Sequence, residues 1–278
     1  MRPFRRIASP PIARSVVACV AALATAAPAA EPRKNLILPG EVFAVGDRTA
    51  FLFTPAAAAA PGAGRKPWIL YAPTLPGLPD GHERWMHERF TSAGVAVAGI
   101  DTGESYGSPE HVRAVEALHA ELVRRGFAKR PALLGRSRGG LAAAAWAAAH
   151  PECTAGLGGI YPVFDWRSYP GIGKAAPAYG ISPEELAARA GEFCPVERIE
   201  AAARADVPVC IIHGDADTLV PIGPNSAELK RRYEAVGKGS LVNLIVAPGQ
   251  GHNLWEGFFR CEALVEFLVA RAKAGAAE

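Results

Sequence analysis

The 278-residue sequence lacks the features of a metal-binding protein and of a membrane-embedded one. Its five cysteines and seven histidines do not show the paired spacing of a zinc site, so the sequence predicts no metal and no cofactor. After the first 30 residues, no apolar stretch approaches the roughly 18–20 residues that a membrane-spanning helix needs. We therefore expect no stable membrane insertion of the chain that follows this segment.

The first 29 residues have the organisation of a secretory signal peptide. Four arginines precede an apolar, Ala- and Val-rich run over residues 15–27, and small residues follow it. We expect cleavage near Ala29 and export to a periplasmic or extracellular location. The pair Arg5-Arg6 leaves both the Sec and the twin-arginine routes open.

Removal of this segment changes the sign of the net charge. The formal net charge falls from +3 to −1, because the segment holds four arginines and no acidic residue. Without a basic excess, neither nucleic acid nor an anionic membrane is expected as a partner. Residues 30–278 are long enough for one large α/β domain.

Four cysteines remain in the expected mature chain, where export would permit a disulfide. Cys210 lies in an apolar, strand-like run and Cys261 on an apolar helical face, so we expect both in the core. Cys153 and Cys194 are left as the one candidate pair, with the bonded and free states both open.

Short apolar runs alternate with amphipathic helical stretches along the chain, which is typical of a mostly parallel sheet covered by helices on both faces. The expected strands are 42–45, 49–54, 68–72, 95–100, 132–134, 156–161, 207–212 and 241–246. The first two form a hairpin-like pair. A helical insertion over residues 169–203 interrupts the alternation and is long enough for a small cap.

The most informative segment is the Leu-Leu-Gly-Arg-Ser-Arg-Gly-Gly sequence at 133–140, where an apolar strand turns into an Ala-rich helix at Ser137. Gly135 and Gly139 lack a Cβ and allow neighbouring backbone to pass close by. The helix start presents unpaired N–H groups that favour an oxyanion. These features indicate a nucleophile elbow, which projects a serine hydroxyl from the end of a sheet.

A second Gly-x-Ser-x-Gly pattern, at residues 103–107, offers Ser105 as an alternative nucleophile. The helix after it is expected to begin only at Ser108, with Pro109 in its first position. Ser105 is therefore expected in an open loop without a tight elbow, and Ser137 is the preferred nucleophile.

A serine nucleophile needs a base within hydrogen-bond reach, and the base needs an orienting acid. His252 alone among the histidines lies in a glycine-flanked loop just after the last strand, whereas His213 is expected to hydrogen-bond the loop that follows it. The loop before the last strand offers Asp215 and Asp217 as acids, and Asp165, after an earlier strand, is the alternative.

The His-Gly-Asp-Ala-Asp-Thr-Leu-Val-Pro sequence at 213–221 resembles the acid loop of the α/β-hydrolase superfamily. The resemblance extends over the chain from about residue 35. It implies an α/β-hydrolase fold, with Asp217 as the triad acid and Asp215 as a brace of the turn. The chain order Ser137, Asp217, His252 is the order of that superfamily.

The same resemblance implies an oxyanion hole formed by the backbone N–H groups of Leu75 and Arg138. The segment 71–77 departs from the His-Gly-Gly form common in lipases and esterases, and Pro76 has no N–H to donate.

The sequence thus predicts an exported serine hydrolase that cleaves a small-molecule or carbohydrate-linked carboxylic ester through an acyl-enzyme intermediate. One alternative is a peptidase similar to the prolyl-oligopeptidase catalytic domain, although the chain is too short to carry that family's propeller. The other is a non-catalytic hydrolase-fold protein used for binding, which has no need of three triad residues.

Overall fold

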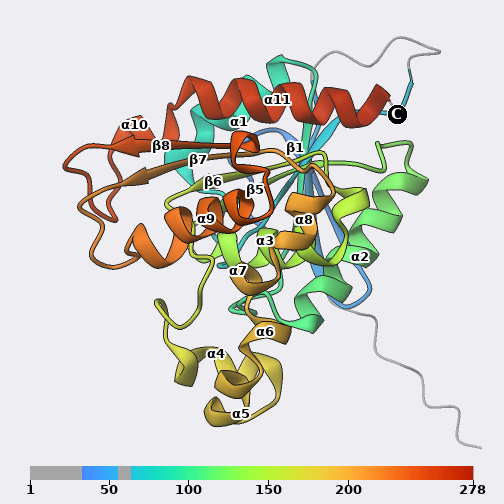
Figure 1. Cartoon of the computed structure of the whole chain (residues 1–278). Coiled ribbons are helices and arrows are strands. Elements are labelled where there is room, and N and C mark those ends of the chain that lie inside the picture. The colour runs from blue at the N-terminus through green and yellow to red at the C-terminus, as the bar shows by residue number, and fades with distance from the viewer. Residues whose placement is uncertain (1–32, 56–63, 278) are drawn as a thin grey trace, which may run out of the picture. The chain divides into compact units, whose positions relative to one another are not determined.

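A computed structural model of the chain describes residues 33–55 and 64–277 (Figure 1). The predicted signal peptide, with its expected cleavage near Ala29, lies outside the described residues. Within the described ranges, no helix has both the length and the apolar character required to cross a membrane.

An eight-stranded sheet is the framework of the described residues, in the order β1-β2-β4-β3-β5-β6-β7-β8. The strands are β1 Gly40–Val45, β2 Arg48–Phe53, β3 Trp68–Tyr71, β4 Ala96–Ile100, β5 Ala132–Arg136, β6 Gly156–Ile160, β7 Val209–Gly214 and β8 Val242–Ala247. β2 is antiparallel to both of its neighbours, and all the other pairs are parallel. Each predicted strand is present to within two residues, and the predicted fold class is confirmed.

Helices cover both faces of the sheet, because the buried strands are apolar on both sides (Figure 1). α1 (Arg84–Ser92) and α11 (Glu262–Ala277) cover one face. α2 (Pro109–Arg124), α3 (Gly139–Ala149) and α9 (Glu228–Ala235) lie on the other. Successive strand residues therefore enter different cores, as when Ala96 and Ala98 pack on one side of β4 and Val97 on the other.

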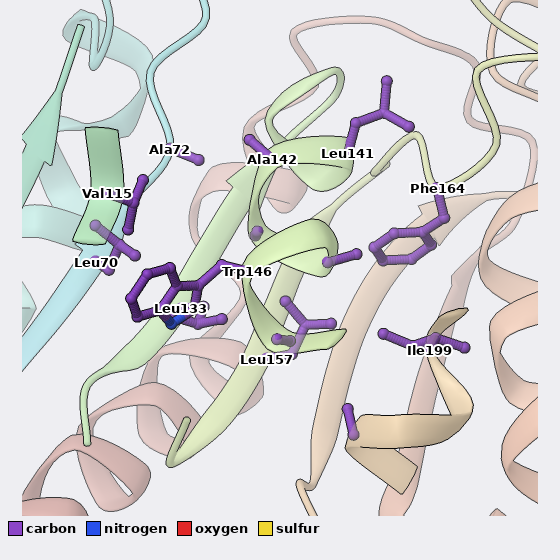
Figure 2. Packing of buried hydrophobic residues seen from close by; sticks show 14 of the residues in the cluster. Leu70, Ala72, Val115, Leu133, Leu141, Ala142, Trp146, Leu157, Phe164 and Ile199 are labelled. Atoms are coloured by element: carbon purple, nitrogen blue, oxygen red, sulfur yellow. The ribbon is translucent and has the colours of Figure 1, made fainter. Parts of the chain in front are cut away.

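Helix α3 packs on the sheet mainly through small side chains. Ten of its 11 residues are buried, and apart from Leu141 and Trp146 these buried residues are glycine or alanine. Small side chains let the helix approach the strands, and Trp146 fills the remaining space against Leu133 and its neighbours (Figure 2). The start of α3 is thereby fixed relative to β5.

The predicted insertion contains a series of short helices between β6 and β7. They are α4 Ile172–Tyr179, α5 Pro183–Ala188, α6 Ala190–Phe193, α7 Pro195–Arg198 and α8 Glu200–Arg204. α7 and α8 pack on α3, whereas α4 and α5 pack together at the lower edge of Figure 1. The Tyr179 hydroxyl donates a hydrogen bond to the Tyr106 carbonyl (2.8 Å), which ties α4 to the loop after β4.

The four described cysteines are free thiols. Cys210 is buried in the sheet as expected, and Cys261 is half-buried against the core. The candidate pair is not bonded: Cys194 is buried with its sulfur 3.5 Å from the Asp165 carboxylate, and the half-buried Cys153 contacts Glu152.

The buried face of α1 carries a titratable side chain, His87, into the apolar core. His87 is fully buried, and neither ring nitrogen has a hydrogen-bond partner among the described residues. Its ring contacts Phe53, Tyr71 and Phe90 edge-on, with centroids 5.4–5.7 Å apart. Burial lowers the pKa of His87 from 6.5 to about 3, so the imidazole is neutral in the folded protein.

We predict that His87→Phe flattens the acid dependence of stability. Below pH 6.5 the unfolded chain binds a proton at His87 that the folded chain does not bind until about pH 3, so folding weakens as the pH falls. Between pH 7 and pH 4.5 this difference in proton binding should lower the free energy of unfolding of the parent protein by about 2–3 kcal/mol, and the variant should lack this loss. Urea titrations across this range measure the effect. His82→Phe, at an exposed histidine, is the control and should keep the parent dependence.

Candidate active site

Ser137 lies at the sharp turn between β5 and α3 with φ +50°, a left-handed conformation that non-glycine residues rarely adopt. Three backbone hydrogen bonds hold this turn. Ser137 N–H donates to the Ile160 carbonyl (3.0 Å), and the Ser137 carbonyl accepts from Val163 (2.8 Å) and Gly140 (2.9 Å). The strained conformation is thus fixed by β6 and by the helix start.

The flanking glycines are required by close backbone approaches. A Cβ on Gly135 would lie 2.6 Å from the Gly139 carbonyl oxygen, and a Cβ on Gly139 would lie 2.7 Å from the Ala72 carbonyl oxygen. The turn therefore folds back on itself and lies against the segment that follows β3.

The structure brings the three predicted triad residues together. The Ser137 Oγ lies 2.9 Å from His252 Nε2, and His252 Nδ1 lies 2.8 Å from Asp217 Oδ2. The residues follow β5, β8 and β7, whose carboxyl ends meet at one edge of the sheet. With its proton on Nδ1, His252 donates to Asp217 and accepts the serine hydroxyl proton at Nε2.

The Asp217 carboxylate is buried and held from several sides. Its Oδ1 accepts hydrogen bonds from the N–H groups of Leu219 (3.0 Å) and Val220 (2.8 Å), which leaves Oδ2 for the imidazole. His213 is also buried, with its ring nitrogens on the Ser226 hydroxyl (2.7 Å) and the Val220 carbonyl (2.9 Å). Burial lowers the pKa of His213, so this second histidine supports the acid loop in its neutral form.

The other candidate residues lie elsewhere. The exposed Asp215 accepts a hydrogen bond from the Gly249 N–H (2.6 Å) and braces the turn that leads to His252. Asp165 pairs with Arg167 (2.9 Å) and is not brought to the imidazole. The hydroxyl of Ser105 lies 3.1 Å from that of Thr102.

Free backbone donors surround the elbow. The N–H groups of Arg138 and Leu75 make no hydrogen bond to any described residue, as an oxyanion hole requires. The N–H of Thr74 is equally free within the described residues, and Thr74 is buried where Leu75 is 45% exposed. The sequence did not indicate Thr74 as a donor, because the loop lacks the His-Gly-Gly motif from which the position of the donor could have been inferred.

Sequence reasoning also missed a buried ionic network next to His252. The Arg136 guanidinium donates to Asp80 (2.9 Å), to Glu83 (3.0 Å) and to the hydroxyl of Tyr161 (3.2 Å). Glu83 is fully buried, and burial raises its pKa while the charge of Arg136 opposes the rise. The Tyr161 ring lies 4.3 Å from the His252 ring, centroid to centroid.

Two sequence signals could have located this network. Arg136 is a charged residue at the end of an otherwise apolar strand, and Asp80 and Glu83 have the spacing of a capping box, which the structure contains. Tyr161, which accepts from Arg136 and packs on the imidazole, links the network to His252.

Asp217→Asn should lower kcat by roughly 1,000-fold or more with the fold intact, because an amide NH₂ cannot accept from the His252 Nδ1–H and favours the wrong tautomer. Asp215→Asn is the matched control and should cost less than tenfold. Steady-state hydrolysis of p-nitrophenyl butyrate by the two variants provides the measurement. A larger loss from Asp215→Asn, or from Asp165→Asn, would contradict this assignment of the acid.

Arg136→Met should destabilise the fold by about 3–5 kcal/mol, because it leaves the Glu83 carboxylate buried without its cation. Adding Glu83→Gln removes that charge and should recover a large part of the loss. Urea unfolding of the two single variants and of the double variant gives the coupling energy. Additive losses would show that the two side chains do not form a coupled buried pair.

Residues 106–270, which include Ser137, Asp217 and His252, match the family model described as "Prolyl oligopeptidase family". No curated protein matches the chain. Among solved structures, a puromycin-hydrolysing peptidase of Mycobacterium tuberculosis is similar with a TM-score of 0.62 and 18% identity. That alignment covers 85% of this chain, which spans only 39% of the peptidase.

Two similar structures have nearly the length of this chain. Est1E from Butyrivibrio proteoclasticus has a TM-score of 0.58 and 19% identity, with 86% of this chain and 99% of Est1E covered. The monoacylglycerol lipase of Paleococcus ferrophilus has a TM-score of 0.55 and 18% identity, with 83% and 99% covered. The chain has the α/β-hydrolase fold, and it belongs to the prolyl oligopeptidase family.

Proposed function

We propose that Ser137, His252 and Asp217 are the catalytic triad of an exported enzyme that hydrolyses carboxylic esters. The observation that carries the proposal is the continuous hydrogen-bond chain from the Ser137 hydroxyl through His252 to Asp217, at a strained elbow beside free N–H donors. Export rests on the sequence of residues 1–29.

In the first half-reaction, Ser137 Oγ attacks the ester carbonyl carbon and His252 Nε2 takes the hydroxyl proton. The carbonyl oxygen becomes an oxyanion that accepts hydrogen bonds from Arg138 N–H and from the N–H of Leu75 or Thr74. As the carbon–oxygen bond to the alcohol breaks, His252 returns the proton to the leaving alcohol. Water then attacks the acyl-enzyme by the same route and releases the acid and Ser137.

Apolar side chains around the triad support an ester with an apolar acyl group. Five large apolar side chains of the described residues are exposed, and four of them lie on the loops that carry the triad or the oxyanion donors. These four are Leu75, Leu219, Leu254 and Trp255, which are 44–53% exposed. Substrate contact would cover part of this surface and explain its exposure.

The likeness to a monoacylglycerol lipase, 99% of which the alignment covers, also supports an esterase. A peptidase of the prolyl-oligopeptidase type is the second candidate function, since the family match leaves the choice between ester and peptide bonds open. The insertion over residues 169–203 is proposed as a cap that selects among substrates of the esterase.

The purified enzyme should react with a fluorophosphonate at Ser137 alone and should hydrolyse p-nitrophenyl butyrate at least 100-fold faster, in kcat/KM, than an aminoacyl-naphthylamide. Among the serines that the structure describes, only Ser137 has both a base and free backbone donors beside it. Mass spectrometry of the labelled digest and steady-state kinetics give the two measurements, with Ser137→Ala as the control for both.

Label on another serine would refute the assigned nucleophile. Faster cleavage of the naphthylamide would replace the esterase with the peptidase. A folded protein that neither reacts with the fluorophosphonate nor turns over either substrate would be a binding protein.

A further inference from the structure

The loop after β3 is tied to the rest of the protein by a single hydrogen bond from a distant residue. Residues 73–79 of this loop carry Thr74 and Leu75, whose N–H groups are the candidate oxyanion donors on this side of the elbow. Among the described residues, only Lys34 hydrogen-bonds this stretch from another segment, and its Nζ donates to the Pro76 carbonyl (2.8 Å). The position of the two donors therefore depends on what holds Lys34.

Lys34 lies in the segment before β1, and its ammonium group is fixed by the sheet. The side chain is only 1% exposed, and lysine is rarely buried to this degree without paired acceptors. Nζ also donates to Asp101 Oδ1 (2.6 Å) and lies 5.4 Å from the centre of the Phe51 ring. Asp101 follows β4, and its N–H donates to the Thr49 carbonyl of β2 (2.8 Å). Lys34 thus connects the loop to two strands of the sheet.

The carbonyl that accepts from Lys34 lies at the centre of a β-turn. The Leu78 N–H donates to the Leu75 carbonyl (3.0 Å), so Pro76 and Gly77 are the two central residues of the turn. Proline followed by glycine is common in type II turns, whose second central residue needs a φ of about +80°. The φ of Gly77 is not positive, which excludes type II and leaves the type I form. The turn has therefore not taken the form that its own sequence favours.

The hydrogen bond from Lys34 accounts for this choice of turn. Types I and II differ chiefly in a rotation of the central peptide by roughly 150–170°, so the carbonyl of that peptide points to opposite sides of the turn. In the type II form the Pro76 carbonyl would point away from Nζ, and the buried ammonium would lose one of its acceptors. Because an unpaired buried donor is costly, Lys34 favours the type I form.

We propose that Lys34 is a positioning residue for the oxyanion hole. Its ammonium group holds the turn in the type I form and so keeps the N–H groups of Thr74 and Leu75 in place before the substrate binds, which is when a donor stabilises an oxyanion best. The loop starts against the elbow, where the Ala72 carbonyl oxygen would lie 2.7 Å from a Cβ on Gly139. The inference rests on the proposed function and adds a residue of the amino-terminal segment to it.

The test removes the hydrogen bond to Pro76 without leaving a buried charge unpaired. Burial raises the pKa of Asp101, and the hydrogen bond and charge of Lys34 oppose the rise, so Lys34→Met is combined with Asp101→Asn. The double variant should lower kcat for p-nitrophenyl butyrate by about tenfold at an unchanged KM, because displaced donors cost less than the roughly 100-fold or more of a deleted one. Asp101→Asn alone is the matched control: it keeps the Lys34 bond to Pro76 and should keep the parent kcat.

A rescue experiment tests the turn itself. Gly77→Ala disfavours the positive φ of the type II form, and a Cβ at this exposed position would meet no atom within 4 Å. In the parent, where the turn already has the type I form, this substitution should leave kcat unchanged. Added to the double variant, it should restore kcat to within about threefold of the parent, since it replaces the preference that Lys34 supplied. A lysine that only stabilises the fold would show no such rescue.

Each outcome decides the proposal. A double variant with the parent kcat, or a loss that Gly77→Ala does not reduce, would overturn it while an active parent leaves the proposed function standing. The rate at which fluorophosphonate labels Ser137 gives the same comparison without a substrate, and so does not depend on the bond that the enzyme cleaves. A parent that neither labels nor turns over substrate refutes the proposed function, and the role of Lys34 with it. Circular dichroism checks folding, and Lys34→Leu with Asp101→Asn replaces a double variant that fails to fold.

Discussion

The strained backbone at Ser137 is the constraint on which the rest of the site depends. A positive φ at a serine persists only where its surroundings hold it, and here the Ile160 carbonyl, the Val163 N–H and the helix start do so. The same turn aims the hydroxyl at His252 and leaves the Arg138 N–H free. The packing of β6 and α3 against β5 therefore maintains the strained turn that presents the proposed nucleophile.

Buried polar groups then determine the positions of the other two residues of the proposed triad. Asp217 is fixed by N–H groups of its own loop and flanked by the neutral His213, while the Tyr161 ring, held by Arg136, packs against the His252 ring. These networks are costly to bury and stabilise little on balance, so their main contribution is a unique geometry for the imidazole. Preorganisation of this kind is what a serine hydrolase requires.

The strands, the elbow and the order of the candidate triad could be predicted because each rests on local chemistry: continuous apolar runs, glycines beside Ser137, and a second aspartate in the loop after β7. The network around Glu83 could not, because it joins residues over 50 positions apart whose burial depends on register. Thr74 was missed for lack of a local motif. The exclusion of Ser105 rested on its open loop, and the structure places its hydroxyl on that of Thr102 rather than on His252.

The composition of α3 limits which sequences this protein can sample in evolution. Nine of its 11 residues are glycine or alanine, and ten are buried, so most substitutions would add volume where the helix meets the sheet. The displaced helix would carry the Arg138 N–H with it. Mutational tolerance should therefore be lowest along α3, although only its first turn lies near Ser137. Variation in substrate range is more readily acquired in the loops after β3, β4, β7 and β8.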